Sequence, residues 1–123
     1  MTADAPGLAG KRFLVAEDNA LIRAAVCEML EAQGAHVVAA EDGEQAVLAF
    51  AACPFDVVLM DVCMAGMDGY AAAQAIRYMD GRVLIFAHTD AGTQYGAEEA
   101  KASGMDGCVR KMSLGELARM LRP

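Results

Sequence analysis

Polar side chains that could do chemistry follow four apolar stretches of this sequence, each near the point where the stretch ends. They are Glu17, Asp18, Asp61, Thr89 and Lys111. If the four ends converge, three carboxylates, a hydroxyl and an ammonium group share one site. Close carboxylates repel one another, and an all-oxygen set without histidine or thiolate suits Mg²⁺, which relieves that repulsion. Because a lysine beside such a cation can neutralise an arriving phosphoryl group, the pattern favours metal-assisted phosphoryl chemistry.

The elements that would position these side chains are short strands. We expect strands over residues 12–16, 35–40, 57–60, 82–87 and 108–109. Most are continuously apolar and rich in branched residues, which is typical of strands buried on both faces of a parallel sheet. In open parallel sheets, ligands bind outside the carboxyl ends of the strands. The polar residues would therefore line one crevice.

Helical periodicity and capping residues indicate a helix after each strand. In the first helix, apolar residues recur at i, i+4, i+7 and i+8, at Ile22, Val26, Met29 and Leu30. N-caps are expected at Asn19, at Asp42 with Gln45, at Asp68, and at Ser113 with Glu116 in a capping box. The segment 91–103 is the weakest helix because it has few large apolar residues. Five strand–helix repeats predict an α/β protein with a doubly wound, five-stranded parallel sheet.

Length and composition limit the kinds of protein this can be. At 123 residues we expect a flexible leader over 1–10 and one domain over 11–123. No apolar run approaches the ~18 residues of a membrane span, so a cytoplasmic protein without membrane insertion is expected. A net charge of −7 argues against nucleic acid as a partner. Cysteines without metal-finger spacing suit a reduced compartment: Cys27, Cys53, Cys63 and Cys108.

The chain resembles the receiver domain of bacterial two-component response regulators, as in the single-domain chemotaxis regulators. The similar motifs are EDN, VVLMDVCMAGMDG, FAHTDA and GMDGCVRK, and they span roughly Lys11 to Leu121. The resemblance implies a flavodoxin-like fold with strand order 2-1-3-4-5. It implies that Asp61 accepts a phosphoryl group from a phosphohistidine, that Thr89 signals and that Lys111 pairs with the phosphate. It also implies a Mg²⁺ site formed by Glu17, Asp18, Asp61 and the backbone carbonyl of Cys63.

The resemblance also implies the partners and the kind of activity. The partners would be a sensor histidine kinase or a histidine phosphotransfer protein, and a downstream target protein. The chain would catalyse only its own phosphorylation and dephosphorylation, and we expect a single-domain regulator that switches protein–protein contacts. A receiver cut from a hybrid kinase is a further reading of the same residues.

Two functions of other classes stay open on the sequence. One is a Mg²⁺-dependent phosphatase with an aspartyl nucleophile, although such enzymes typically have a second aspartate where Cys63 stands. The other is a phosphorylation-independent pseudo-receiver that only binds partners. Incubation with Mg²⁺ and a small phosphodonor separates the three functions.

Three positions depart from the family pattern. Ala65 and Met112 stand where prolines are usual, the second of them typically after a cis bond, and Cys108 replaces an aromatic residue. We therefore expect the placement of Lys111 and the coupling of hydroxyl and aromatic to differ from the family's usual form. His88 is expected to be partly exposed and without a role in the site.

Overall fold

The computed structural model of the chain describes residues 7–62, 68–89 and 97–121. In these ranges one parallel sheet of five strands has the order β2-β1-β3-β4-β5. The strands are β1 (Arg12–Ala16), β2 (His36–Ala40), β3 (Val57–Met60), β4 (Leu84–Thr89) and β5 (Gly107–Arg110). The predicted doubly wound sheet and its strand order 2-1-3-4-5 are confirmed.

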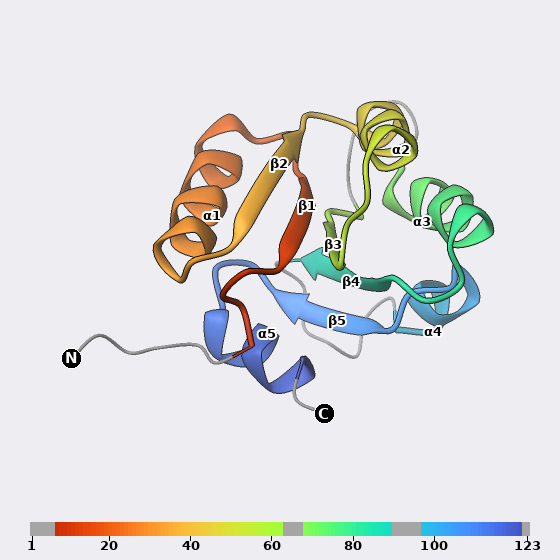
Figure 1. Cartoon of the computed structure of the whole chain (residues 1–123). Coiled ribbons are helices and arrows are strands. Elements are labelled where there is room, and N and C mark those ends of the chain that lie inside the picture. The colour runs from red at the N-terminus through yellow and green to blue at the C-terminus, as the bar shows by residue number, and fades with distance from the viewer. Residues whose placement is uncertain (1–6, 63–67, 90–96, 122–123) are drawn as a thin grey trace.

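Helices cover both faces of this sheet. They are α1 (Ala20–Ala32), α2 (Gly43–Ala52), α3 (Gly69–Met79), α4 (Ala97–Ala102) and α5 (Leu114–Met120). Figure 1 shows α1 and α5 on one side of the sheet and α2, α3 and α4 on the other. No helix of the described ranges is long and apolar enough to cross a membrane.

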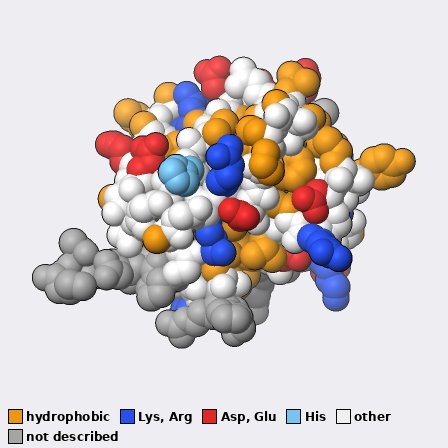
Figure 2. Space-filling view, in the orientation of Figure 1, with side chains coloured by type: hydrophobic (Ala, Val, Ile, Leu, Met, Phe, Trp, Pro, Cys, Tyr) orange, Lys and Arg blue, Asp and Glu red, His pale blue; other side chains and the backbone are white. Residues whose placement is uncertain are grey.

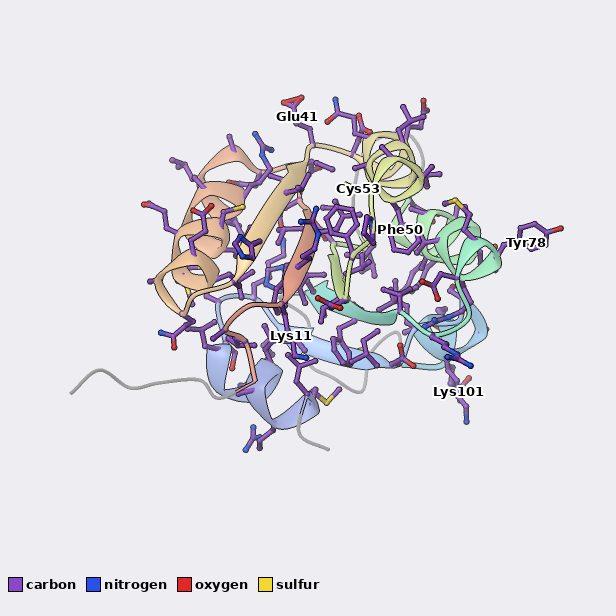
Figure 3. The ribbon with its side chains drawn as sticks, viewed as in Figure 1. Lys11, Glu41, Phe50, Cys53, Tyr78 and Lys101 are labelled. Carbon is purple, nitrogen blue, oxygen red and sulfur yellow. The ribbon has the colours of Figure 1, made fainter. Side chains whose placement is uncertain are left out.

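Each face of the sheet has its own hydrophobic core. Val15 and Leu59 pack with Leu30 of α1 and Leu117 of α5. Their neighbours along the strands face the opposite way, because successive side chains of a strand alternate between its two faces. This second core includes Val58 and Met60 of β3, Phe50 of α2 and Ile76 of α3, and Figure 3 shows Phe50 pointing from α2 toward the sheet. Burial on both faces explains the continuously apolar strand sequences.

The surface is mixed in character. On the face shown in Figure 2, acidic and basic side chains are interspersed with apolar ones. Among the described residues, the most exposed large apolar side chains are Tyr78 at 94% exposure, Leu21 at 84% and Leu48 at 70%. In Figure 3, Tyr78 points away from the body of the domain at the end of α3. These residues lie on three different helices, α3, α1 and α2.

The predicted helix N-caps are present. Side-chain oxygens of the caps accept backbone N–H groups in the first turn of four helices, at Asn19, Asp42, Asp68 and Ser113. The capping box at the last helix is only half formed, however. The Ser113 hydroxyl accepts the Glu116 N–H at 3.3 Å, but the Glu116 carboxylate accepts the N–H of Arg110 instead of that of Ser113.

The bounds of β4 differ from the prediction of residues 82–87. The strand begins two residues later because Asp80 Oδ1 accepts the N–H groups of Arg82 and Val83, at 2.7 and 3.1 Å, and holds them in a turn. It ends two residues later because His88 and Thr89 still pair with β5. In the helix predicted over 91–103, the described part is helical from Ala97 to Ala102, and residues 91–96 lie outside the described ranges.

The packed structure begins earlier than the expected start at Lys11. Leu8 is fully buried in the core beneath α1 and α5. The Lys11 N–H donates to the Leu8 carbonyl at 3.2 Å, and the Gly10 N–H donates to the Gly34 carbonyl at 2.9 Å. The end of the predicted leader is therefore tied to the domain, because Leu8 supplies the apolar area that its neighbours lack. Residues 1–6 lie outside the described ranges.

Candidate functional site

The register of the sheet brings the predicted acidic residues together. Ala16, Met60 and Ala87 lie side by side on neighbouring strands. The residues that come directly after them in the chain are Glu17, Asp61 and His88. These three residues therefore lie at the same carboxyl edge of the sheet. The convergence expected from the sequence therefore results from parallel pairing without a register shift.

Three carboxylates form a cluster at this edge. One carboxylate oxygen each from Glu17, Asp18 and Asp61 lies within 4.8 Å of the others. Glu17 is fully buried and Asp61 is 3% exposed, whereas Asp18 faces solvent. The Asn19 N–H donates to Glu17 Oε2 at 3.2 Å and fixes the turn after β1. The cluster is thus closed on its protein side and open at Asp18.

Lys111 supplies a positive charge to this cluster. Its Nζ lies 2.9 Å from Glu17 Oε1 and 3.3 Å from Asp61 Oδ2, and the side chain is largely buried. Burial raises the pKa of Glu17, and the nearby Asp61 carboxylate raises it further, although the hydrogen bond with Lys111 acts in the opposite direction. Burial alone would lower the pKa of Lys111, but Glu17 and Asp61 raise it overall. Lys111 is therefore held as a cation beside the predicted acceptor.

Thr89 lies at the same edge as the last residue of β4. It is buried, and its carbonyl oxygen accepts the Lys111 N–H at 3.0 Å. The structure therefore joins two predicted site residues, Thr89 and Lys111, through the backbone.

His88 is buried, whereas the sequence predicts a partly exposed residue. It is 2% exposed, and its Nδ1 lies 3.9 Å from Glu17 Oε1. It borders a small apolar space of about 10 Å³ between β4, α1 and α5. The strand's alternation of side chains was the missed signal, because it places His88 on the same face as the buried Phe86.

Sequence reasoning also missed Arg23. From α1 its Nη1 donates to the Glu17 carbonyl at 2.9 Å, and its Nη2 lies 3.8 Å from Glu41 Oε1. Figure 3 shows Glu41 at the turn between β2 and α2. Arg23 therefore ties the acidic turn to two neighbouring segments, a contact that no local pattern reveals.

Two departures from the family pattern have structural outcomes. The Lys111–Met112 bond is trans, and Met112 has a φ of 67°. Cys108 is half-buried, packs against the core on the α2–α4 face, and burial raises the pKa of its thiol. A raised pKa disfavours the reactive thiolate. The other predicted positions, Cys63 and Ala65, lie outside the described residues.

A doubly wound sheet of order 2-1-3-4-5 has the flavodoxin-like topology, and here an acidic cluster and a buried lysine lie at its carboxyl edge. Residues 13–122 match the family model of the response regulator receiver domain. The chain belongs to this family and is a receiver domain of two-component signal transduction. Receiver domains are phosphoacceptor signalling domains.

Relatives agree in sequence and in fold. The sensor protein GacS of Pseudomonas syringae pv. syringae is 38% identical over 119 residues, which are 89% of this chain and 13% of GacS. The structure of the chemotaxis protein CheY4 of Vibrio cholerae superimposes with a TM-score of 0.83 at 28% identity, covering 92% of this chain and 97% of CheY4.

A second similar structure contains ligands. The receiver domain of the histidine kinase CKI1 from Arabidopsis thaliana, solved with Mg²⁺ and BeF₃⁻, has a TM-score of 0.85 and 31% identity over 98% of this chain and 93% of that one. This chain spans only 9% to 13% of the length of the sensor proteins BvgS and GacS that it matches.

Proposed function

We propose that Asp61 is the phosphoacceptor and that it takes its phosphoryl group from a phosphohistidine on a sensor histidine kinase or a histidine phosphotransfer protein. The observation that carries this proposal is the buried Asp61 carboxylate, 3.3 Å from Lys111 Nζ and clustered with Glu17 and Asp18. The likeness to receiver parts of histidine kinases supports the choice of donor.

The reaction needs little covalent chemistry from the protein. A carboxylate oxygen of Asp61 attacks the phosphorus, the P–N bond breaks, and its electron pair stays on the imidazole nitrogen. The product is an acyl phosphate on Asp61. Catalysis then depends on alignment and on stabilising charge, which the Lys111 ammonium group provides for the phosphoryl oxygens.

The donor set fits a divalent cation. Three carboxylates and one lysine carry a formal charge of about −2 when all are ionised, and every candidate ligand is a hard oxygen atom. Glu17, Asp18 and Asp61 would hold Mg²⁺ together with the carbonyl of Cys63, which lies outside the described residues. When bound, Mg²⁺ supplies charge neutralisation for the transferred phosphoryl group.

Phosphorylation then acts as a switch on protein–protein contacts. A phosphoryl group adds about −1.5 to −2 charge at Asp61, close to Lys111 and therefore to the end of β4. The Thr89 carbonyl accepts the backbone N–H of Lys111, so a shift of the Lys111 backbone toward the new charge moves the strand end that carries the Thr89 hydroxyl. The downstream target is a protein that distinguishes these two arrangements. We place this exchange in the cytoplasm, where histidine kinases use ATP.

Incubation with Mg²⁺ and a small acyl phosphate tests the proposal. A phosphoacceptor gains one lasting phosphoryl group per chain and releases phosphate slowly. Continuous phosphate release without a lasting adduct would indicate a phosphatase, and neither adduct nor release would indicate a binding module. The Asp61→Asn variant is the control, because its amide keeps the shape of the side chain but not the nucleophile.

A further inference from the structure

The turn that carries Lys111 is an unusual one. The Ser113 N–H donates to the Arg110 carbonyl at 3.1 Å, which closes a four-residue turn, and Met112 within it has a φ of 67°. This is the pattern of a type II turn, whose third residue is normally glycine or asparagine. A methionine in left-handed geometry is strained, so contacts outside the turn must hold it.

Glu116 makes such a contact from the first turn of α5. Its Oε1 accepts the Arg110 N–H at 2.9 Å, and its Oε2 accepts Arg110 Nε at 2.5 Å. The Lys111 N–H points to β4, where it donates to Thr89, so the preceding N–H of Arg110 points to the open edge of the sheet. Glu116 therefore fills the place that a further strand would occupy.

The turn is thus held at two successive backbone N–H groups, one on each side. Thr89 holds the N–H of Lys111, and Glu116 holds the N–H of Arg110. The Glu116 side chain is largely buried, at 14% exposure, whereas the Arg110 side chain is 63% exposed. The ion pair contributes less, because solvent screens it on the side of the exposed Arg110 guanidinium group. The backbone hydrogen bond is the contact that constrains the turn.

We propose that Glu116 is a positioning residue that fixes the 110–113 turn in its left-handed form and so directs Lys111 toward Glu17 and Asp61. This inference rests on the proposed role of Lys111 in binding the phosphoryl group. Glu116 touches neither site carboxylate, and it acts on the site only through the backbone. Helix α5 therefore contributes to the geometry of the phosphoryl site.

Three variants separate the backbone contact from the ion pair. Glu116→Ala removes both contacts. Glu116→Gln keeps an oxygen that accepts the Arg110 N–H, and Arg110→Gln removes the ion pair but leaves the N–H in place. The probe is BeF₃⁻ with saturating Mg²⁺, which mimics a phosphoryl group on a carboxylate. We expect Glu116→Ala to weaken BeF₃⁻ binding about tenfold, with the other two variants within about twofold of the wild type.

A double-mutant cycle shows whether Glu116 acts through Lys111. In a Lys111→Ala background, Glu116→Ala should cause no further loss of BeF₃⁻ affinity, because the group it positions is gone. Equal losses in both backgrounds would overturn the inference. So would an unchanged affinity in Glu116→Ala if Lys111→Ala alone weakens binding.

Hydrogen exchange without ligand is the second readout. In Glu116→Ala the N–H groups of Lys111 and Ser113 should exchange faster, while that of Val15 in the sheet centre stays protected. Faster exchange at the N–H groups of Lys111, Ser113 and Val15 alike would indicate general destabilisation. Unchanged exchange at Lys111 and Ser113 would indicate that Glu116 does not hold the turn. Each of these two results contradicts a positioning role. If the wild type does not bind BeF₃⁻, the proposed function fails, and the exchange result alone decides whether Glu116 fixes the turn.

Discussion

Replacing Gly69 with alanine tests how closely the start of α3 approaches Asp61, the proposed acceptor. A Cβ at this position would overlap the Asp61 carbonyl oxygen and would lie 2.7 Å from Val62 Cα and 2.9 Å from the Asp61 carbonyl carbon. Ordinary van der Waals contacts of a Cβ are 3.4–4 Å. The atoms it meets belong to the backbone, so they cannot rotate away as the end of a side chain could. Either Asp61 or the start of α3 must move.

The size of the effect follows from two opposing terms. Overpacking a close-packed site costs roughly 1–3 kcal/mol, and a clash with backbone points to the upper end. The better helix propensity of alanine offsets up to about 1 kcal/mol of this. We expect Gly69→Ala to lower the free energy of unfolding by about 2 kcal/mol, which lowers Tm by roughly 8 °C. Because the proposed acceptor Asp61 shifts, phosphorylation should slow by about tenfold or more.

Urea denaturation followed by circular dichroism measures the stability, and adduct formation with a small acyl phosphate and Mg²⁺ measures the rate. Gly115→Ala is the matched control, since its added Cβ meets open space, with no atom within 4 Å beyond its chain neighbours and the backbone of its own helix. That variant should stabilise α5 by about 0.5–1 kcal/mol and leave the rate unchanged. A Gly69→Ala protein as stable and as reactive as the wild type would refute the close approach.

Three further predictions concern the turn, the buried acid and the metal. The Met112→Gly protein should be more stable to chemical denaturation than the Met112→Ala protein by about 0.5–1 kcal/mol, because only glycine takes a positive φ without strain. A Met112→Ala protein that is the more stable of the two would contradict the turn geometry. Burial raises the pKa of Glu17. This shift therefore adds to the free energy of unfolding below the ordinary pKa of 4.5, and the contribution is lost as the pH rises through the raised value. In Mg²⁺-free buffer the stability advantage of Glu17→Gln should therefore grow with pH over that window, and a constant difference would argue against the shift. By titration calorimetry, Asp18→Ala should lose most of its Mg²⁺ affinity while Lys111→Ala retains it, and equal affinities in Asp18→Ala and the wild type would remove Asp18 from the metal site.

Much of the fold follows from local patterns. The strand 57–60 is buried on both faces. Its sequence predicts this burial because no polar residue interrupts it. Asn19 and Asp42 cap helices through hydrogen bonds that span three residues or fewer, so the sequence contains both partners. The site could be predicted for a related reason. Parallel strands end at one edge, so Glu17 and Asp61 converge once the sheet is inferred.

The remaining features depend on contacts between distant segments. Glu116 has the position of a capping-box residue in the sequence. In the structure its carboxylate instead accepts the Arg110 N–H, which points to the open edge of β5, where no strand can accept it. Leu8 lies in a stretch of low periodicity, and only the space beneath α1 and α5 explains its burial. The close approach of Gly69 to Asp61 is likewise invisible in sequence, because it joins the start of α3 to the residue after β3.

The identity of the phosphoacceptor is the most direct test of the whole account. Intact-mass spectrometry after incubation with Mg²⁺ and a small acyl phosphate, followed by peptide mapping, measures how many phosphoryl groups bind and where. The wild type should gain one acid-labile group on Asp61 only when Mg²⁺ is present, and Asp61→Asn should gain none while retaining the wild-type circular dichroism spectrum. A folded Asp61→Asn protein that still gains a stoichiometric phosphoryl group would contradict the account.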